Sequence, residues 1–220
     1  EYIVFDGFAA YNTATATTRS VSRASLKELH SGERTVNQPD NLYGHYIERY
    51  VASKTLEKVE LPVTMRPLTY TYIVKIEVTK GNKYIALARG ALAGMAEKVY
   101  LNDGHTDASS ATVLFDCEKT DFGAVAYVKS FGVPNYPGDH YTKSDDTPMK
   151  YTLNFEMMLT NGKMKSVDVD ITSQMRGQPR GGVIVATGIE ISDEEGAGDG
   201  GFDVDVDGWG DYIDIPVELN

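Results

Sequence analysis

The sequence predicts an all-β fold, an antiparallel β-sandwich with at most one or two short helices, and three observations support this. Residues 69–80 alternate apolar and polar side chains with the period of two that suits a strand with one buried face. Tyr is frequent, with 14 residues, and favours strands. Apolar residues make up 41% of the 220 positions, so the chain can bury a substantial core.

The strand expected over residues 69–80 separates its two faces cleanly. One face carries Tyr70, Tyr72, Val74, Ile76 and Val78, whereas the other carries mostly polar side chains. Two further strands with matching apolar sets are expected on either side of the turn signal near residue 161. From these runs we expect a core that contains Tyr72, Val74, Ile76, Leu153, Phe155, Val167 and Val169.

Two registers are open to the hairpin that turns at Asn161-Gly162. A two-residue loop would pair Phe155 with Asp168 and place the apolar sets of the two strands on opposite faces. A three-residue loop, with Gly162 in the left-handed region, pairs Phe155 with Val167 and unites the apolar faces. The sequence therefore predicts the three-residue turn.

Two segments are helix candidates. Residues 22–29 are predicted to form one short helix with a serine as its N-cap. Residues 86–97 are rich in Ala, but Gly90 and Gly94 interrupt them and limit a helix there to a turn or two. Later in the chain we expect a strand over residues 183–192, an acidic, glycine-rich connection over 193–201 and the final strand or strands over 202–219.

The chain is expected to divide near residue 50. Residues 1–50 are interpreted as the remnant of an N-terminal β domain plus a linker, and residues 51–220 as the β-sandwich domain. The chain opens inside a strand-like run, residues 2–5, and no signal peptide opens it. We therefore expect the first residues of the natural precursor to be missing.

The charge of the chain argues against two classes of partner. A formal net charge of −11 disfavours nucleic acid, whose phosphates need a dense Lys/Arg surface, and it disfavours an anionic membrane surface. No apolar run reaches the ~20 residues that a helix needs to span a bilayer. We therefore expect no nucleic-acid partner and no transmembrane segment.

The sharpest motif is an acidic run near the C-terminus. With Gly208 at its centre, it has the spacing of an EF-hand calcium loop. However, no helical pattern flanks it, Pro216 follows closely, and its twelfth residue is Asp rather than the usual Glu. We favour a strand whose carboxylates point to solvent and hold no ion. The candidate ligands are Asp203, Asp205, Asp207, Asp211 and Asp214.

Other chemistry-bearing residues are explained more simply by structure. Asp168 and Asp170 offer the two carboxylates of acid–base catalysis, but they alternate with apolar residues as on a solvated strand face. The single cysteine, Cys117, shares a strand face with Val113 and Phe115 and is interpreted as a packed, inert thiol. No nucleotide-binding, hydrolase or metalloprotease motif is present, so we expect no catalytic residue and no cofactor.

Two further sets of side chains have a binding interpretation. Tyr136, Tyr141 and Trp209 would suit an aromatic platform for sugars, although packing in the core and at its rim explains these rings more simply. The histidines have no second histidine at metal-ligand spacing. We expect exposed loop positions for His30, His45, His105 and His140.

Three segments carry a family resemblance: LPVTMRPLTYTYIVKIEVT at 61–79, ALARGALAGMAEKVYLNDG at 86–104 and VDGWGDYIDIPVEL at 206–219. They resemble the fimbrillin-like surface proteins of Bacteroides-type bacteria, over roughly residues 40–220. The resemblance implies exported outer-membrane lipoproteins built from two transthyretin-like β-sandwich domains. Members polymerise into pili by donating a strand, or serve as tips, anchors or standalone lipoproteins. Against that family pattern, we expect the signal peptide, the lipidated cysteine and most of the first domain to be missing from this chain.

The leading interpretation is therefore a non-catalytic structural or adhesive subunit of the cell surface, fimbrial or anchored in the outer membrane. The alternative is a surface module that binds carbohydrate or another host ligand, with or without calcium; a hydrolase ranks third. The expected partners are other pilus or surface subunits, and host glycans or proteins. Strand addition would use the chain ends, residues 2–5 and 201–219, with Trp209 and Ile213 as anchors. We expect the C-terminal strand to pair within its own chain in the isolated protein.

Overall fold

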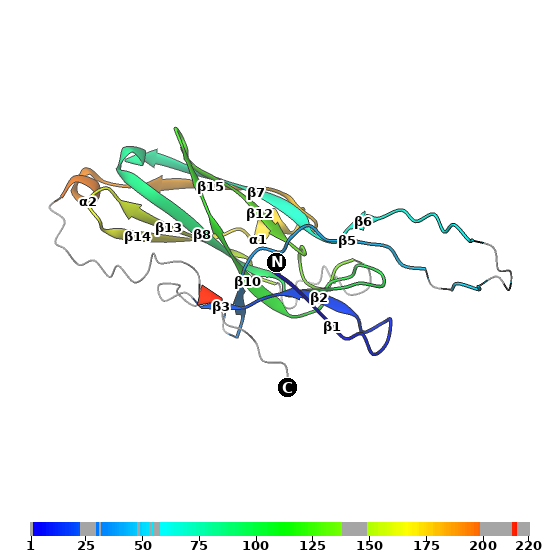
Figure 1. Cartoon of the computed structure of the whole chain (residues 1–220). Helices are drawn as coiled ribbons and strands as arrows, with labels where there is room; N and C mark the ends of the chain where they lie inside the picture. Colours follow the sequence, from blue (N-terminus) through cyan, green and yellow to red (C-terminus); the bar gives the residue numbers. More distant parts are fainter. Residues whose placement is uncertain are drawn as a thin grey trace.

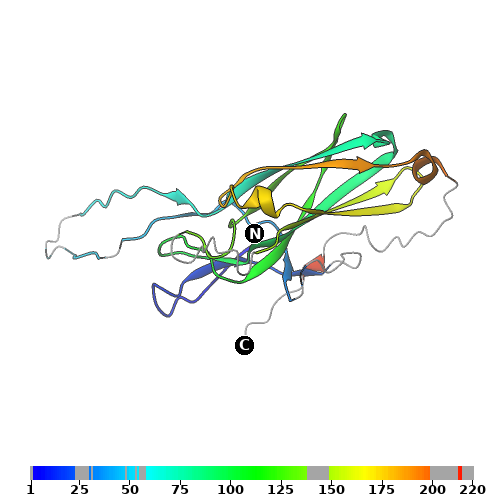
Figure 2. The same ribbon diagram turned by 180° about the vertical axis from the view of Figure 1, so that it is seen from behind.

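The computed structural model of the protein is a β-sandwich with a small additional sheet and a long projecting arm (Figure 1). The view from behind shows the arm leaving one end of the sandwich, away from α2 (Asp193–Ala197) at the other end (Figure 2). The structure describes residues 2–22, 30, 32–47, 49–52, 54, 58–137, 149–198 and 213–214, with backbone alone at 22, 213 and 214.

Two sheets form the sandwich. The first contains, in spatial order, β14 (Met164–Asp170), β13 (Thr152–Leu159), β8 (Ile85–Ala96), β10 (Ser110–Asp116) and β4 (Arg34–Val36). The second contains β11 (Glu118–Thr120), β12 (Gly123–Ser130), β7 (Tyr70–Lys80) and β15 (Gly182–Glu190). Neighbouring strands are antiparallel, except that β4 runs parallel to β10 and β15 parallel to β7. The predicted all-β class is confirmed.

Smaller elements attach to these sheets. A three-stranded sheet contains β1 (Ile3–Asp6), β2 (Thr15–Thr18) and β9 (Lys98–Tyr100). Two short ladders join β3 (Val21–Ser22) to β16 (Ile213–Asp214) and β5 (Tyr43–Gly44) to β6 (Arg66–Pro67). The helical elements are η1 (Asn82–Tyr84), α1 (Thr172–Met175) and α2 (Asp193–Ala197).

The core lies between the two sandwich sheets and is built from the alternating faces of their strands. Tyr72, Val74 and Ile76 on β7 are fully buried, as are Leu153 and Phe155 on β13. On the edge strand β14 the predicted core residues Val167 and Val169 are half-buried and pack against the same cluster. The predicted core is therefore confirmed, with its edge strand less covered than its centre.

The hairpin between β13 and β14 has the predicted three-residue turn. Phe155 pairs with Val167 and Leu153 pairs with Val169, so the apolar faces coincide. Gly162 has a φ of 83°, in the left-handed region. The backbone N–H of Leu159 donates to the carbonyl of Lys163 at 2.8 Å and closes the turn.

The predicted helix over residues 86–97 is wrong, because this segment is the central strand β8 between β13 and β10. Gly90 lies opposite both Phe155 and Phe115, and a Cβ built there would lie 2.4 Å from the Phe115 ring. Gly94, with a φ of 88°, lies at the irregularity where the pairing with β10 shifts register. The glycines that weakened the helix prediction are therefore sites of close approach in a sheet, where packing overrides the helix propensity of Ala.

The glycine-rich connection predicted over residues 193–201 is corrected at its start, where α2 forms. Ser192 and Glu195 build a reciprocal capping box: the Glu195 N–H donates to the Ser192 hydroxyl and the Ser192 N–H to the Glu195 carboxylate. The predicted strand over 183–192 is confirmed as β15. In the helix predicted over 22–29, residues 23–29 lie outside the described residues, and Ser22 ends β3.

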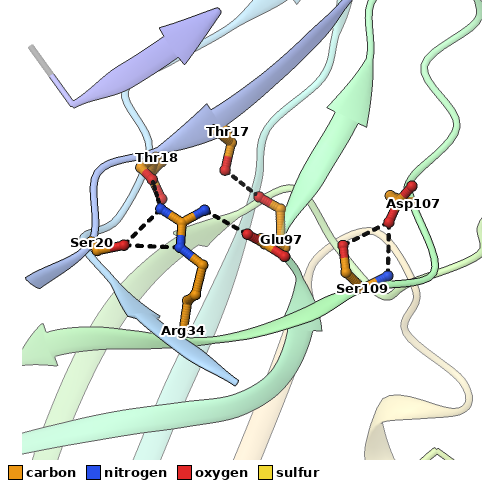
Figure 3. A network of polar contacts seen from close by, with 7 residues as sticks. All are labelled: Thr17, Thr18, Ser20, Arg34, Glu97, Asp107 and Ser109. Atoms are coloured by element: carbon orange, nitrogen blue, oxygen red, sulfur yellow. Dashed lines mark hydrogen bonds and ion pairs between the residues drawn. The ribbon is translucent and has the colours of Figure 1, made fainter. Parts of the chain in front are cut away.

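A polar network joins the three-stranded sheet to the sandwich (Figure 3). The Arg34 guanidinium of β4 donates to the Ser20 hydroxyl and forms an ion pair with the Glu97 carboxylate at 2.5 Å. The Thr17 hydroxyl of β2 donates to the Glu97 carbonyl at 2.8 Å. Strands from the first 50 residues thus bond to strands from the rest of the chain, while the predicted division near residue 50 stays a prediction.

Candidate functional site

The predicted calcium ligands fall mostly outside the described residues. This is the case for Asp203, Asp205, Asp207 and Asp211, whereas Asp214 lies in β16, with its backbone paired to Val21. The expectation that these carboxylates face solvent without an ion stays a prediction. Among the residues that the structure describes, no group of three or more His, Cys, Asp or Glu is arranged to hold a metal.

The histidines are more structured than predicted. His30 and His105 are half-buried, so the prediction of exposed loop positions is wrong for both, because each is held by a nearby carboxylate. The His105 ring stacks on Tyr100, with ring centroids 4.1 Å apart, and contacts the Asp103 carboxylate. His45 is exposed as predicted, and His140 lies outside the described residues.

The buried carboxylate of Glu33 is a junction that the sequence did not reveal. Its two oxygens accept from the Ser110 hydroxyl at 2.6 Å, the Thr112 hydroxyl at 2.8 Å and the Gly94 N–H at 3.2 Å. The His30 ring lies 2.9 Å from the Glu33 carboxylate and 3.1 Å from the Thr152 hydroxyl. Hydroxyl, imidazole and carboxylate follow the order of a nucleophilic triad. Here, however, the Glu33 carboxylate accepts hydrogen bonds from donors on β8 and β10. It therefore holds the segment before β4 against the sheet.

The paired carboxylates on β14 occupy a solvated strand face, as predicted. Asp168 and Asp170 are both exposed. Asp168 accepts from the Asn154 side-chain amide at 2.7 Å. Hydrogen bonds from Thr172 hold the pKa of Asp170 below its ordinary value. A carboxyl held ionised in this way suits capping of the α1 segment rather than proton transfer.

Cys117 follows β10 and packs against the main core, half-buried. Desolvation, assisted by the charge of Asp116, raises the pKa of its thiol to about 12. The reactive form of cysteine is the thiolate, which is scarce at neutral pH when the pKa is this high. The geometry agrees with a packed, inert thiol.

We expect Cys117 to react with iodoacetamide at pH 8 at least ~100-fold more slowly in the folded protein than in urea, because unfolding returns its pKa to about 8.5. Mass spectrometry of the carbamidomethylated chain over time measures both rates. Equal rates in the folded and unfolded protein would contradict a buried thiol.

The proposed aromatic platform is not assembled among the described residues. Tyr141 and Trp209 lie outside them, and Tyr136 is half-buried. The Arg180 guanidinium lies 5.0 Å from the centre of the Tyr136 ring and 5.3 Å from that of Tyr70. These rings are therefore engaged by a cation of the same chain, as expected for packing at the rim of the core.

Among the described residues, exposed apolar side chains are concentrated on the arm and the N-terminal hairpin, a feature that the sequence did not reveal. The arm consists of residues 43–67, between β5 and β6. Among its described residues, the exposed large apolar side chains are Tyr43, Ile47, Tyr50, Val51, Val59, Leu61, Val63 and Met65. The β1–β2 hairpin beside it adds Tyr2, Phe5, Phe8 and Tyr11. Large apolar patches on a protein surface mark interaction sites.

An apolar groove of about 580 Å³ lies where the arm joins the body. The body contributes Phe5, Leu42 and Leu101, and the base of the arm contributes apolar side chains that include Ile47 and Met65. The Tyr11 ring of the hairpin stacks on Tyr46 of the arm, with centroids 5.9 Å apart and planes inclined by 16°. The hairpin, groove and arm base thus form one continuous candidate interaction surface.

The free side of β15, by contrast, is closed by glutamine side chains. The Gln174 amide of α1 accepts from the Val185 N–H and donates to the Val185 carbonyl, both at 2.8 Å. Gln178 makes the same pair of contacts with Val183. Two side chains thus imitate a neighbouring strand at alternate residues, which prevents this edge from pairing with another chain.

Replacing both Gln174 and Gln178 by Ala is expected to lower the free energy of unfolding by about 1–3 kcal/mol, because four hydrogen bonds to the edge are lost and water replaces them. It should also produce concentration-dependent association through the opened edge. Urea titration and light scattering measure the two effects. Gln174→Glu, which keeps the acceptor and loses the donor, should lie in between, and an unchanged association state would contradict the protective role.

Comparison with known proteins places the chain in a family. It belongs to the family described as a domain of unknown function, DUF5119, whose match covers residues 1–116. Among the part of the chain that the structure describes, no helix is both long and apolar enough to cross a membrane.

Individual relatives add to this. The chain is 23% identical over 247 aligned positions to a protein of Bacteroides ovatus provisionally named fimbrium anchoring subunit Fim4B, over 99% of this chain and 72% of that protein. It is also similar in fold to the crystal structure of a protein from Bacteroides ovatus provisionally described as an adhesin. That likeness has a TM-score of 0.62 and 20% identity, and it covers 87% of this chain and 71% of the other.

Proposed function

We propose that the chain is a non-catalytic structural subunit of a cell-surface fimbrium or a related adhesin-like assembly. The observation that carries this proposal is the alignment with the provisionally named anchoring subunit across 99% of the chain. The all-β architecture and the likeness in fold to the protein described as an adhesin support it. The location that follows is the cell surface, fimbrial or anchored at the outer membrane, with other pilus or surface subunits as partners.

We further propose that the subunit joins its neighbours by strand addition through its C-terminal segment. In the structure the backbone of this segment returns to its own chain, where Ile213 pairs with Ser22 and Asp214 with Val21. The same backbone groups that pair here within the chain can pair with the edge of a neighbouring subunit instead, as in strand addition. The isolated chain then pairs with itself, and the assembled chain pairs with the next subunit.

Deleting residues 201–220 tests both roles. We expect the truncated chain to fold, because the core cluster of the sandwich is built from residues between Val36 and Ile191. We expect surface assembly, measured by immunoblotting of sheared fimbriae, to be lost. Normal assembly of the truncated chain would refute strand addition through this segment. Loss of the folded state, by circular dichroism, would show that the segment serves the chain's own sandwich instead.

A further inference from the structure

The arm has almost no internal support. Its base is the two-residue ladder between β5 and β6, and the His45 ring lies 2.8 Å from the Thr64 carbonyl just beyond it. From 45 to 65, no backbone hydrogen bond joins the two limbs among the described residues. Both views show the arm extending away from the sandwich (Figures 1 and 2). An isolated two-stranded ribbon is marginally stable in water, so this geometry suits an element completed by another chain.

The side chains of the arm have the pattern of a strand that lies on an apolar surface. On the returning limb, Val59, Leu61, Val63 and Met65 alternate with Glu60, Pro62 and Thr64, and each of the four is about half exposed. Four further exposed apolar residues lie on the outgoing limb, so both limbs of the arm present apolar side chains to solvent. A row of exposed apolar side chains of this kind marks an interaction surface.

Charge identifies the kind of surface that would receive the arm. Residues 43–67 contain four basic and three acidic residues and so carry a net charge of +1. Because the whole chain carries −11, the remaining residues carry −12. The residues that line the groove carry no acidic or basic side chain other than His45, so charge acts between the arm and the wider body rather than inside the groove. An arm of net positive charge is complementary to the strongly negative remainder of a second copy of the same chain.

We propose that two copies of this chain pair by reciprocal arm exchange, with the arm of each copy lying in the groove of the other. The groove lies at the base of the arm. When the arms of two copies run antiparallel, the outer part of one arm, with Tyr50, Val51 and Val59, therefore reaches the groove of the other copy. The same surface is used on both copies, which closes the pair by a two-fold axis. The pairing is independent of the C-terminal segment and of the proposed fimbrial role.

Sedimentation equilibrium of the intact chain at 1 to about 100 μM tests the pairing over the range of typical transient and stable dimers. We expect a monomer–dimer equilibrium. Leu61→Glu should raise the dissociation constant at least ~100-fold, because a charge would enter an apolar contact. Leu87→Glu is the matched control, because Leu87 is exposed to 48% and Leu61 to 50%, but Leu87 lies on β8. A monomeric wild type, or equal effects of both substitutions, would overturn the proposal.

The arrangement of the two copies is tested by cross-linking. In chains in which Cys117 is replaced by Ser, one population carries Phe5→Cys and the other Val51→Cys. Mixing them under oxidation should yield the mixed disulfide in excess over either homodimer, because the arm of one copy reaches the groove of the other. Predominance of Val51–Val51 cross-links would refute the groove as the receiving surface. Oligomers that grow beyond two with concentration would refute the closed two-fold pair in favour of head-to-tail binding.

Discussion

Replacing Arg89 by Leu is expected to lower the free energy of unfolding by about 3–5 kcal/mol, since it leaves a buried carboxylate without its ion pair. Arg89 on β8 lies directly across from Glu156 on β13, and its Nε donates to Glu156 Oε2 at 2.8 Å. Both side chains are about 6% exposed. Replacing both residues by Leu should restore most of the loss, because an apolar pair needs no desolvated charge. Urea unfolding of Arg89→Leu, of Glu156→Leu and of the double variant measures this double-mutant cycle.

The same substitution should change the pH dependence of stability. Burial raises the pKa of Glu156, while the Arg89 charge opposes this rise. A carboxyl with a raised pKa in the folded chain binds its proton more readily there than in the unfolded chain. Stability therefore falls as pH rises through the range between the pKa values of the unfolded and the folded chain. Without Arg89 the pKa of Glu156 in the folded chain rises further. The destabilisation should therefore be larger at pH 7 than at pH 5, and an equal loss at both values would contradict the assignment.

Gly94→Ala is expected to lower the free energy of unfolding by about 2–5 kcal/mol. Alanine would have to adopt a left-handed backbone conformation, and its Cβ would overpack the site. The φ of Gly94 is 88°, and a Cβ there would lie 2.5 Å from the Lys150 carbonyl oxygen, which is backbone and cannot turn aside as a side chain would. Gly162→Ala is the matched control: its φ is 83°, but no atom lies within 4 Å of the Cβ position. The control should cost about 1–2 kcal/mol.

Thermal and urea unfolding of the two alanine variants gives the difference directly. A Gly94→Ala variant as stable as Gly162→Ala would contradict the close approach of β8 to the backbone at Lys150. The comparison also tests why β8 carries glycine at this irregularity in its pairing with β10, since backbone conformation is common to both sites and crowding is not.

The parts of the fold that depend on local alternation could be predicted from the sequence. The face of β7 with Tyr72, Val74 and Ile76 and the register of Phe155 against Val167 both follow from a side-chain period of two. The helix prediction for residues 86–97 was wrong, because the helical propensity of Ala is overridden in a central strand. The small side chains of this segment let the neighbouring strands approach closely. The cap at Ser192 and Glu195 had a readable signal, since Ser followed three residues later by Glu is the pattern of a capping box.

The candidate interaction surface could not be predicted in the same way. Alternating apolar residues such as Leu61 and Val63 look the same in sequence whether they enter the core or extend into solvent. The Glu33 junction brings together residues more than 60 positions apart. The side chains of Gln174 in α1 and of Gln178 after it reach a strand that follows them in the chain. Such contacts depend on topology rather than on local pattern.

The central claim, a structural role in a surface fimbrium, is tested most directly by immunogold electron microscopy of the native cells that produce this protein. An epitope inserted at the exposed turn between β13 and β14, beside Gly162, lies outside the arm and outside the paired strands. We predict gold at the cell surface, along fimbriae or at their ends. Gold confined to the cell interior, on cells that bear fimbriae, would contradict the proposed role.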